Sequence, residues 1–237
     1  MTLSIRLVRK RMVINEIFYS LQGEGGLAGV PSVFVRLAGC PLRCRWCDTK
    51  YAWSDSAGKD YTAEEVKEQV QSYPANHLVI TGGEPMTNPE LPEFLNQLAD
   101  DNLHITIETS GIKFVPDLPC DLMSISPKLA NSTPTEADLA AQHESQRFNL
   151  SALQQLTGRY EYQLKFVMDV LEDIDEINEC LKKLKNVNPG KVFLMPQAQR
   201  LDEYLAKSKM VAELCKQTGF RFSPRLQVLL WNGARGR

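Results

Sequence analysis

The chain has 237 residues, of which 43% are hydrophobic and 24% charged, a balance typical of one large globular domain or two small ones. This composition excludes a disordered or fibrous protein. The 27 lysines and arginines nearly match the 29 aspartates and glutamates, so the net charge of −2 predicts neither a nucleic-acid-binding protein nor a membrane-surface protein. No apolar run approaches the roughly 20 residues that a membrane-spanning helix requires.

The first eleven residues form a basic leader, and no apolar segment follows it before Asn15 and Glu16. This pattern differs from a secretory signal, so we expect a cytoplasmic protein whose six cysteines are reduced. No internal repeat or long flexible linker divides the remaining chain. Residues 12–237 are therefore interpreted as a single domain.

Short apolar segments rich in β-branched residues predict a series of strands along the chain. Several of them are apolar at nearly every position, which is typical of parallel strands buried on both faces. The predicted strands are residues 33–38, 78–81, 103–109, 122–126, 160–168, 191–195 and 226–231.

Amphipathic segments with a period of 3.6 residues lie between these strands and predict helices. The first begins with a capping box, in which Thr62 and Glu65 can each bond the backbone N–H near the other. Residues 134–147 are polar and predict a loop or a short, exposed surface helix. The other predicted helices are residues 89–99, 149–156, 174–184 and 203–215. Strands that alternate with helices indicate an α/β fold.

Glycines and polar residues follow the predicted strands at their C-terminal ends, where α/β barrels build their active sites. About seven short strands are too few for a complete eight-stranded barrel. We therefore predict an incomplete, open TIM-like barrel of about six parallel strands. The segments at this rim are residues 39–40, 82–85, 108–111, 126–128 and 196–197.

Three cysteines, Cys40, Cys44 and Cys47, lie within eight residues, which predicts a metal site in a reducing compartment. A closed zinc site needs four ligands, and no fourth ligand lies nearby in the sequence. Three thiolates can instead hold a four-iron cluster in which one iron stays open to an external ligand. The histidines are distant and in unrelated contexts: His77, His104 and His143. A zinc site remains an alternative if one scattered cysteine completes it: Cys120, Cys180 or Cys215.

Residues 82–85 read Gly-Gly-Glu-Pro. The glycines allow backbone to approach a ligand closely, Pro85 fixes the turn, and the carboxylate of Glu84 can accept a hydrogen bond from an ammonium group. Together with the Cys-x3-Cys-x2-Cys loop and the aromatic Trp46, this segment resembles the radical S-adenosylmethionine (SAM) superfamily. The resemblance implies a radical SAM core with a [4Fe-4S] cluster whose open iron binds SAM, which one electron cleaves to a 5′-deoxyadenosyl radical.

Further segments resemble the 7-carboxy-7-deazaguanine synthases and together span most of residues 12–231: residues 14–25, 34–40, 46–49, 81–85, 108–111, 126–128 and 194–197. The resemblance implies conversion of 6-carboxy-5,6,7,8-tetrahydropterin to 7-carboxy-7-deazaguanine with loss of ammonia, on the route to queuosine and related 7-deazapurines. It also implies Mg²⁺, a flavodoxin or ferredoxin as electron donor, and a homodimer.

The same resemblance implies roles for individual residues. Arg36 would bind the substrate carboxylate, a task suited to a guanidinium on an otherwise apolar strand. Thr49 would bind Mg²⁺ through its hydroxyl, leaving most coordination to water and substrate. The substrate-binding residues would be Leu21, Gln22, Gly23, Arg36 and Thr81. The residues around SAM would be Trp46, Cys47, Asp48, Gly83, Ser126, Pro127, Lys128, Pro196 and Gln197.

Lys128 could pair with the carboxylate of SAM, and the arginine-rich residues 221–237 resemble a tail that folds over the substrate. Two alternative functions are weighed against this reading. An activating enzyme that places a glycyl radical on a partner protein would share the cysteine loop but would not account for residues 21–25 or Thr49. A zinc-stabilised binding module without catalysis would be colourless and would need a fourth protein ligand.

Overall fold

The computed structural model describes residues 11–100 and 102–236, whose strands form a single sheet in the order β3-β1-β2-β4-β5-β6-β7-β8-β9. The sheet does not close, because β3 and β9 remain at its two ends. The strands are β1 (Met12–Leu21), β2 (Pro31–Leu37), β3 (Lys59–Tyr61), β4 (His77–Gly82), β5 (His104–Thr109), β6 (Leu122–Ile125), β7 (Tyr162–Met168), β8 (Val192–Pro196) and β9 (Arg221–Phe222).

Six strands, β2 and β4 to β8, pair in parallel from one neighbour to the next, and the two-residue β9 continues them. This arrangement confirms the predicted open barrel of about six parallel strands. On the other side of β2, β1 and β3 run antiparallel to their neighbours.

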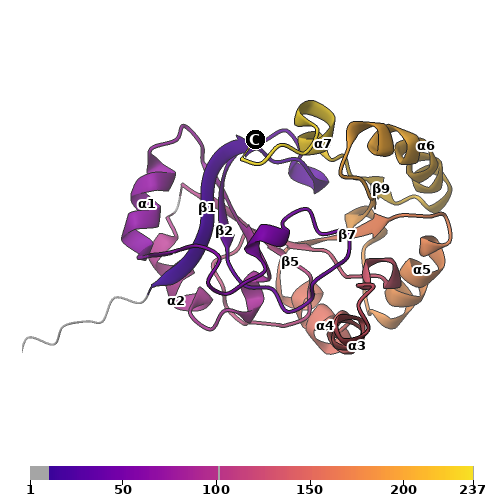
Figure 1. The fold of residues 1–237 in the computed structure, drawn as a ribbon, viewed down its shortest axis with the longest axis horizontal. Coiled ribbons are helices and arrows are strands. Elements are labelled where there is room, and N and C mark those ends of the chain that lie inside the picture. The colour runs from indigo at the N-terminus through magenta and orange to yellow at the C-terminus, as the bar shows by residue number, and fades with distance from the viewer. Residues whose placement is uncertain (1–10, 101, 237) are drawn as a thin grey trace, which may run out of the picture.

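The helices lie along the outside of the curved sheet, with α1 and α2 toward one end and α5 and α6 toward the other (Figure 1). Thr62 and Glu65 form the predicted capping box at the start of α1, which satisfies two backbone N–H groups. The helices are α1 (Ala63–Gln71), α2 (Leu91–Leu98), α3 (Ala137–Gln146), α4 (Leu150–Arg159), α5 (Asp173–Lys183), α6 (Leu201–Thr218) and α7 (Leu226–Trp231).

The apolar core lies between the sheet and these helices. Every residue of β7 and β8 is buried, as strands covered on both faces require, although β7 includes the polar residues Gln163 and Lys165. The apolar stripe of α2, with Leu91 and Leu95 fully buried, packs into the same cluster as β4 and β5. Cys180 and Cys215 occupy helix positions within this core and are removed from the ends of the strands.

Two predictions about local structure differ from the structure. Residues 226–231 form α7 rather than a strand, because a six-residue apolar run fits either element and here closes onto the loop after β1 through Leu226 N–H and the Gly23 carbonyl. Residues 134–147 contain α3, a short helix as expected, but His143 on it is fully buried rather than exposed.

Only Arg11 of the predicted leader falls within the described residues, so the leader stays a prediction. No helix among the described residues is long and apolar enough to span a bilayer.

Candidate active site

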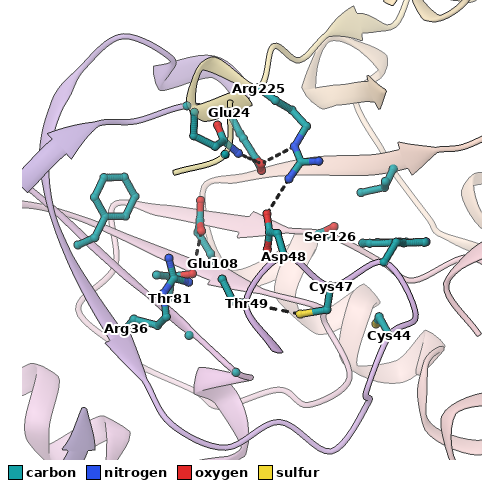
Figure 2. A pocket seen from close by; sticks show the side chains of 18 of the residues that line it. Glu24, Arg36, Cys44, Cys47, Asp48, Thr49, Thr81, Glu108, Ser126 and Arg225 are labelled. Carbon is teal, nitrogen blue, oxygen red and sulfur yellow. Dashed lines mark hydrogen bonds and ion pairs between the residues drawn. The ribbon is translucent and has the colours of Figure 1, made fainter. Parts of the chain in front are cut away.

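A cavity of about 490 Å³ lies inside the open barrel and includes the C-terminal ends of its parallel strands. Its size is typical of a ligand site. Figure 2 shows side chains from several strands and loops directed toward it. Predicted site residues in its lining are Leu21, Gln22, Gly23, Arg36, Cys40, Cys44, Trp46, Cys47, Asp48, Thr49, Thr81, Gly83, Ser126 and Lys128. Three predicted residues lie outside the lining: Pro127, Pro196 and Gln197.

The three clustered cysteines all reach this cavity from the loop after β2. Burial raises the pKa of the Cys40 thiol to about 11 and also raises the pKa of Cys44. Among residues 11–100 and 102–236, no three acidic, histidine or cysteine side chains converge on a point that could hold one metal ion. A four-iron cluster needs no such convergence, because each thiolate binds a different iron. The scattered cysteines do not reach the cavity: Cys120, Cys180 and Cys215.

The two glycines of residues 82–85 allow contact between this turn and the cysteine loop. A Cβ atom on Gly83 would lie 1.9 Å from the Gly39 carbonyl oxygen, so only glycine fits. The Gly83 N–H donates to the Leu37 carbonyl at 3.0 Å, and the Glu84 N–H donates to the Gly39 carbonyl at 2.8 Å. The glycines therefore bring two segments of the protein together, and their predicted close approach to a ligand stays a prediction.

Glu84 lines the cavity, and its role as an acceptor for a ligand's ammonium group stays a prediction. Its buried carboxylate accepts from Thr109 Oγ1 at 2.6 Å, from the Met86 N–H at 3.1 Å, from the Ser110 N–H at 2.7 Å and from the Ser110 hydroxyl. Four donors occupy the lone pairs of both oxygens. Glu84 therefore ties the end of β4 to the end of β5.

The segment after β1 crosses the inside of the barrel and forms part of the cavity wall. Gln22 is buried there and donates to Glu108 on β5 at 3.3 Å. Two residues further on, Glu24 pairs with Lys165 on β7 at 2.9 Å. The Gly26 N–H then donates to Gln163, also on β7, at 2.8 Å. This segment therefore joins the two sides of the open sheet.

A buried charged cluster occupies this wall, and the sequence did not identify its central member, Lys165. Its ammonium group, 4% exposed, lies 2.9 Å from Glu24 and 3.6 Å from Glu108. Arg225 also pairs with Glu24, at 3.3 Å, and with Asp48, at 2.6 Å (Figure 2). Burial alone would raise the pKa of Glu24, but the charges of Lys165 and Arg225 lower it to about 2. The available signal was a lysine within a predicted buried strand, residues 160–168.

Arg36 extends from β2 into the cavity, where its Nε donates to Glu16 at 2.8 Å. Burial disfavours the charge on Arg36, but Tyr51 and Glu16 outweigh this effect and raise its pKa. Tyr51 donates to the same Glu16 oxygen at 2.9 Å, and Arg235 donates to the second oxygen at 2.8 Å. Glu16 therefore orients two guanidinium groups.

Polar groups on the strand ends complete the wall. The Thr81 hydroxyl donates to Glu108 at 2.9 Å (Figure 2). The ammonium group of Lys128 donates to the Ser126 carbonyl at 2.8 Å and to its hydroxyl at 2.9 Å, and it lies 5.7 Å from the ring centre of Trp46.

The carboxyl-terminal residues contribute to the cavity as well. Arg225 and Gln227 line it, and Gln227 donates to Glu24 at 2.8 Å. Residues 233–236 also line the cavity, and Arg235 lies over the ring of Tyr51 with its guanidinium carbon 4.0 Å from the ring centre. The expected tail over the site therefore lies against the site wall.

His143 corrects the expectation that no histidine lies near the cysteine loop. Its Nε2 is 3.6 Å from the Cys44 sulfur and 3.2 Å from the Ser132 hydroxyl. A separation of 99 residues between His143 and Cys44 hid this contact from the sequence pattern.

Comparison with known proteins agrees with this site. The family model described as the radical SAM superfamily matches residues 35–196. The 7-carboxy-7-deazaguanine synthase of Halobacterium salinarum is 41% identical over 93% of this chain and 91% of its own length, and that of Rhodopirellula baltica is 36% identical over 98% and 91%. The crystal structure of QueE from Escherichia coli superposes with a TM-score of 0.69 at 29% identity, covering 90% of this chain and 93% of that one.

These relatives match neither alternative, the activating enzyme or the zinc-stabilised module. Superfamily membership carries a [4Fe-4S] cluster and SAM as cofactors, and the loop of three cavity-lining cysteines suits that cluster. The chain is a radical SAM enzyme and belongs to the 7-carboxy-7-deazaguanine synthase family.

Proposed function

We propose that this enzyme converts 6-carboxy-5,6,7,8-tetrahydropterin to 7-carboxy-7-deazaguanine with loss of ammonia. The observation that carries the proposal is one cavity lined both by the three loop cysteines and by the predicted substrate residues Gln22, Arg36 and Thr81. Cys40, Cys44 and Cys47 would hold the cluster. When bound, the cluster and SAM supply a 5′-deoxyadenosyl radical that removes a substrate hydrogen.

Arg36 would bind the substrate carboxylate. Glu16 accepts from its Nε and so fixes the plane of the guanidinium, and a fixed plane favours bidentate contact with a carboxylate. The site is largely shielded from water, with Arg36 and Glu16 each 13% exposed, which strengthens such an ion pair.

The wall that carries Glu24, Glu108 and Lys165 would hold the pterin ring. Glu24 and Glu108 offer carboxylate oxygens to ring N–H donors, and Lys165 between them offsets their charge. Gln22 and Thr81 donate to Glu108 and hold its carboxylate in position. The protein thus offers the substrate both a cation and hydrogen-bond acceptors.

Trp46, Cys47, Asp48 and Gly83 would surround SAM, because they line the cavity next to the cysteine loop. The cavity-lining Ser126 and Lys128 belong to the same proposed set. Lys128 is supported as a partner for the SAM carboxylate by its position over Trp46. Three further residues of the proposed SAM set lie outside the lining of this cavity: Pro127, Pro196 and Gln197.

Mg²⁺ would bind at Thr49, whose hydroxyl lies at the cavity, 3.5 Å from the Cys47 sulfur. One neutral oxygen ligand suits a hard octahedral ion that keeps water and substrate oxygens as its other ligands.

A flavodoxin or ferredoxin would supply the electron, and the enzyme would act as a homodimer, as the family resemblance suggests. The enzyme would act in the cytoplasm, where a reducing environment keeps cysteines free of disulfides.

The test is anaerobic reconstitution with iron and sulfide, followed by addition of reductant, SAM, Mg²⁺ and the tetrahydropterin. We expect an EPR signal that SAM perturbs and 7-carboxy-7-deazaguanine by mass spectrometry. Cys44→Ala should abolish both while the chain stays folded, and Arg36→Ala should weaken pterin binding but spare SAM cleavage. A cluster without the product, or an active Cys44→Ala variant, would refute the proposal.

A further inference from the structure

Helix α3 is fastened to the segments that form the cysteine side of the cavity. Gln142 Nε2 donates to the Pro41 carbonyl at 3.3 Å, next to Cys40. One turn further along the chain, Arg147 donates to the Lys128 carbonyl at 2.9 Å. The helix therefore contacts both the cysteine loop and the segment that follows β6.

His143 is the residue of α3 that reaches the cysteines. It is fully buried, and its Nε2 lies 3.6 Å from Cys44 Sγ and 3.2 Å from Ser132 Oγ. Its other ring nitrogen, Nδ1, has no hydrogen-bond partner among the described residues. Nδ1 is 3.9 Å from a Glu144 carboxylate oxygen, beyond hydrogen-bond distance, so the hydrogen-bond contacts of this ring are those with Ser132 and Cys44.

The position of the ring hydrogen follows from Ser132. The Ser132 hydroxyl donates its single hydrogen to the Leu129 carbonyl at 2.6 Å, so it can only accept from His143. Nε2 must then carry the ring hydrogen, and Nδ1 is the bare nitrogen, in agreement with its lack of a partner. The same Nε2–H faces the Cys44 sulfur.

We propose that His143 is a positioning residue that donates a hydrogen bond from Nε2 to the Cys44 sulfur and thereby raises the reduction potential of the cluster that Cys44 holds. The cluster gains negative charge when it is reduced, and a hydrogen-bond donor to a ligand sulfur stabilises that charge. Cys40 and Cys47 have different donors, backbone N–H groups for the former and the Thr49 hydroxyl for the latter. The inference rests on the proposed function only in placing the cluster at these cysteines.

Three variants test the hydrogen bond in the reconstituted holoenzyme. His143→Phe fills the buried space without a donor, His143→Gln restores an N–H near the Nε2 position, and Gln142→Ala removes a different contact between α3 and the loop. The readouts are iron per chain and the midpoint potential from an EPR-monitored redox titration. We expect a more negative midpoint in His143→Phe, with reductive SAM cleavage slower by about tenfold, and wild-type midpoints in the other two.

His143→Gln remains available as the test if His143→Phe retains no iron. Its amide can still donate to the Cys44 sulfur, so iron per chain and the midpoint should stay near the wild-type values. A shifted midpoint in an iron-replete His143→Gln variant would overturn the proposal. An unchanged midpoint in His143→Phe, or an equal shift in His143→Gln, would also overturn it, because the N–H would then be irrelevant.

The titration requires no pterin. A wild-type enzyme that forms a cluster but makes no 7-carboxy-7-deazaguanine would refute the proposed reaction and leave the His143 result interpretable. Product formation by the wild type together with unchanged midpoints in the variants would support the proposed reaction and refute the role of His143.

Discussion

Replacement of Lys165 by methionine should destabilise the folded chain through charge rather than through packing. Methionine has a similar length and fills the buried space. The change leaves Glu24 with Arg225 as its remaining cation and removes the cation that Glu108 pairs with. Removing one partner of a buried ion pair costs about 3–5 kcal/mol.

The pKa of Glu24 gives a similar magnitude. A carboxyl whose pKa falls from 4.5 to about 2 on folding stabilises the folded state by about 3 kcal/mol at neutral pH. Because the pKa is lowered, this contribution is complete above the unfolded value of 4.5 and disappears as the pH falls to about 2. In a chain of this size, about 3 kcal/mol corresponds to a melting temperature lower by about 6–12 °C.

Urea unfolding of the cluster-free chain, followed by circular dichroism between pH 2 and pH 7, measures this effect. We expect the difference between wild type and Lys165→Met to be largest above pH 4.5 and to shrink toward pH 2. Glu24→Gln should cost less in the Lys165→Met background than alone. A loss that is equal at pH 7 and pH 2 would refute the electrostatic reasoning and identify a packing defect.

Three further predictions concern the helix cap, the glycine turn and the scattered cysteines. Thr62→Ala removes half of the capping box of α1 and should cost about 1 kcal/mol in urea unfolding, whereas the exposed Ser72→Ala should cost less. Gly83→Ala places a Cβ against the Gly39 carbonyl and should reduce iron per chain after reconstitution. The combined change of Cys120, Cys180 and Cys215 to alanine should leave iron per chain unchanged, whereas any of them acting as a ligand would lower it.

The parallel strands could be predicted well because their burial on both faces is visible in the sequence as continuous apolar segments. Strands covered on both faces must be apolar throughout, and residues 78–81 and 191–195 carry that pattern into β4 and β8. Residues 226–231 carry a similar pattern, yet they form α7, because a short apolar run does not distinguish a strand from a helix. The contact that decides between them, with Gly23, lies about 200 residues away in the chain.

The candidate site shows the same contrast between features visible in the sequence and contacts made only in the folded chain. The cysteine loop was predicted because its three ligands are close in sequence, and the substrate residues were predicted through a family resemblance. Lys165 and His143 were not predicted, because each contacts the site through a partner far along the chain. Glu24, for example, is 141 residues from Lys165. Glu84 was located, but its contacts with Thr109 and Ser110 were not predicted, since these residues become its neighbours only in the folded sheet.

Arg235 closes the wall beside Glu16, although 219 residues separate the two in the chain. A ribosome needs roughly 10–40 s to synthesise that length. The parallel strands from β2 to β8 can pair during this interval, but Glu16 receives its second guanidinium only after Arg235 has emerged. Assembly of this pocket is therefore a late event in biosynthesis, so a nascent enzyme can have an ordered sheet while its catalytic chamber is still incomplete.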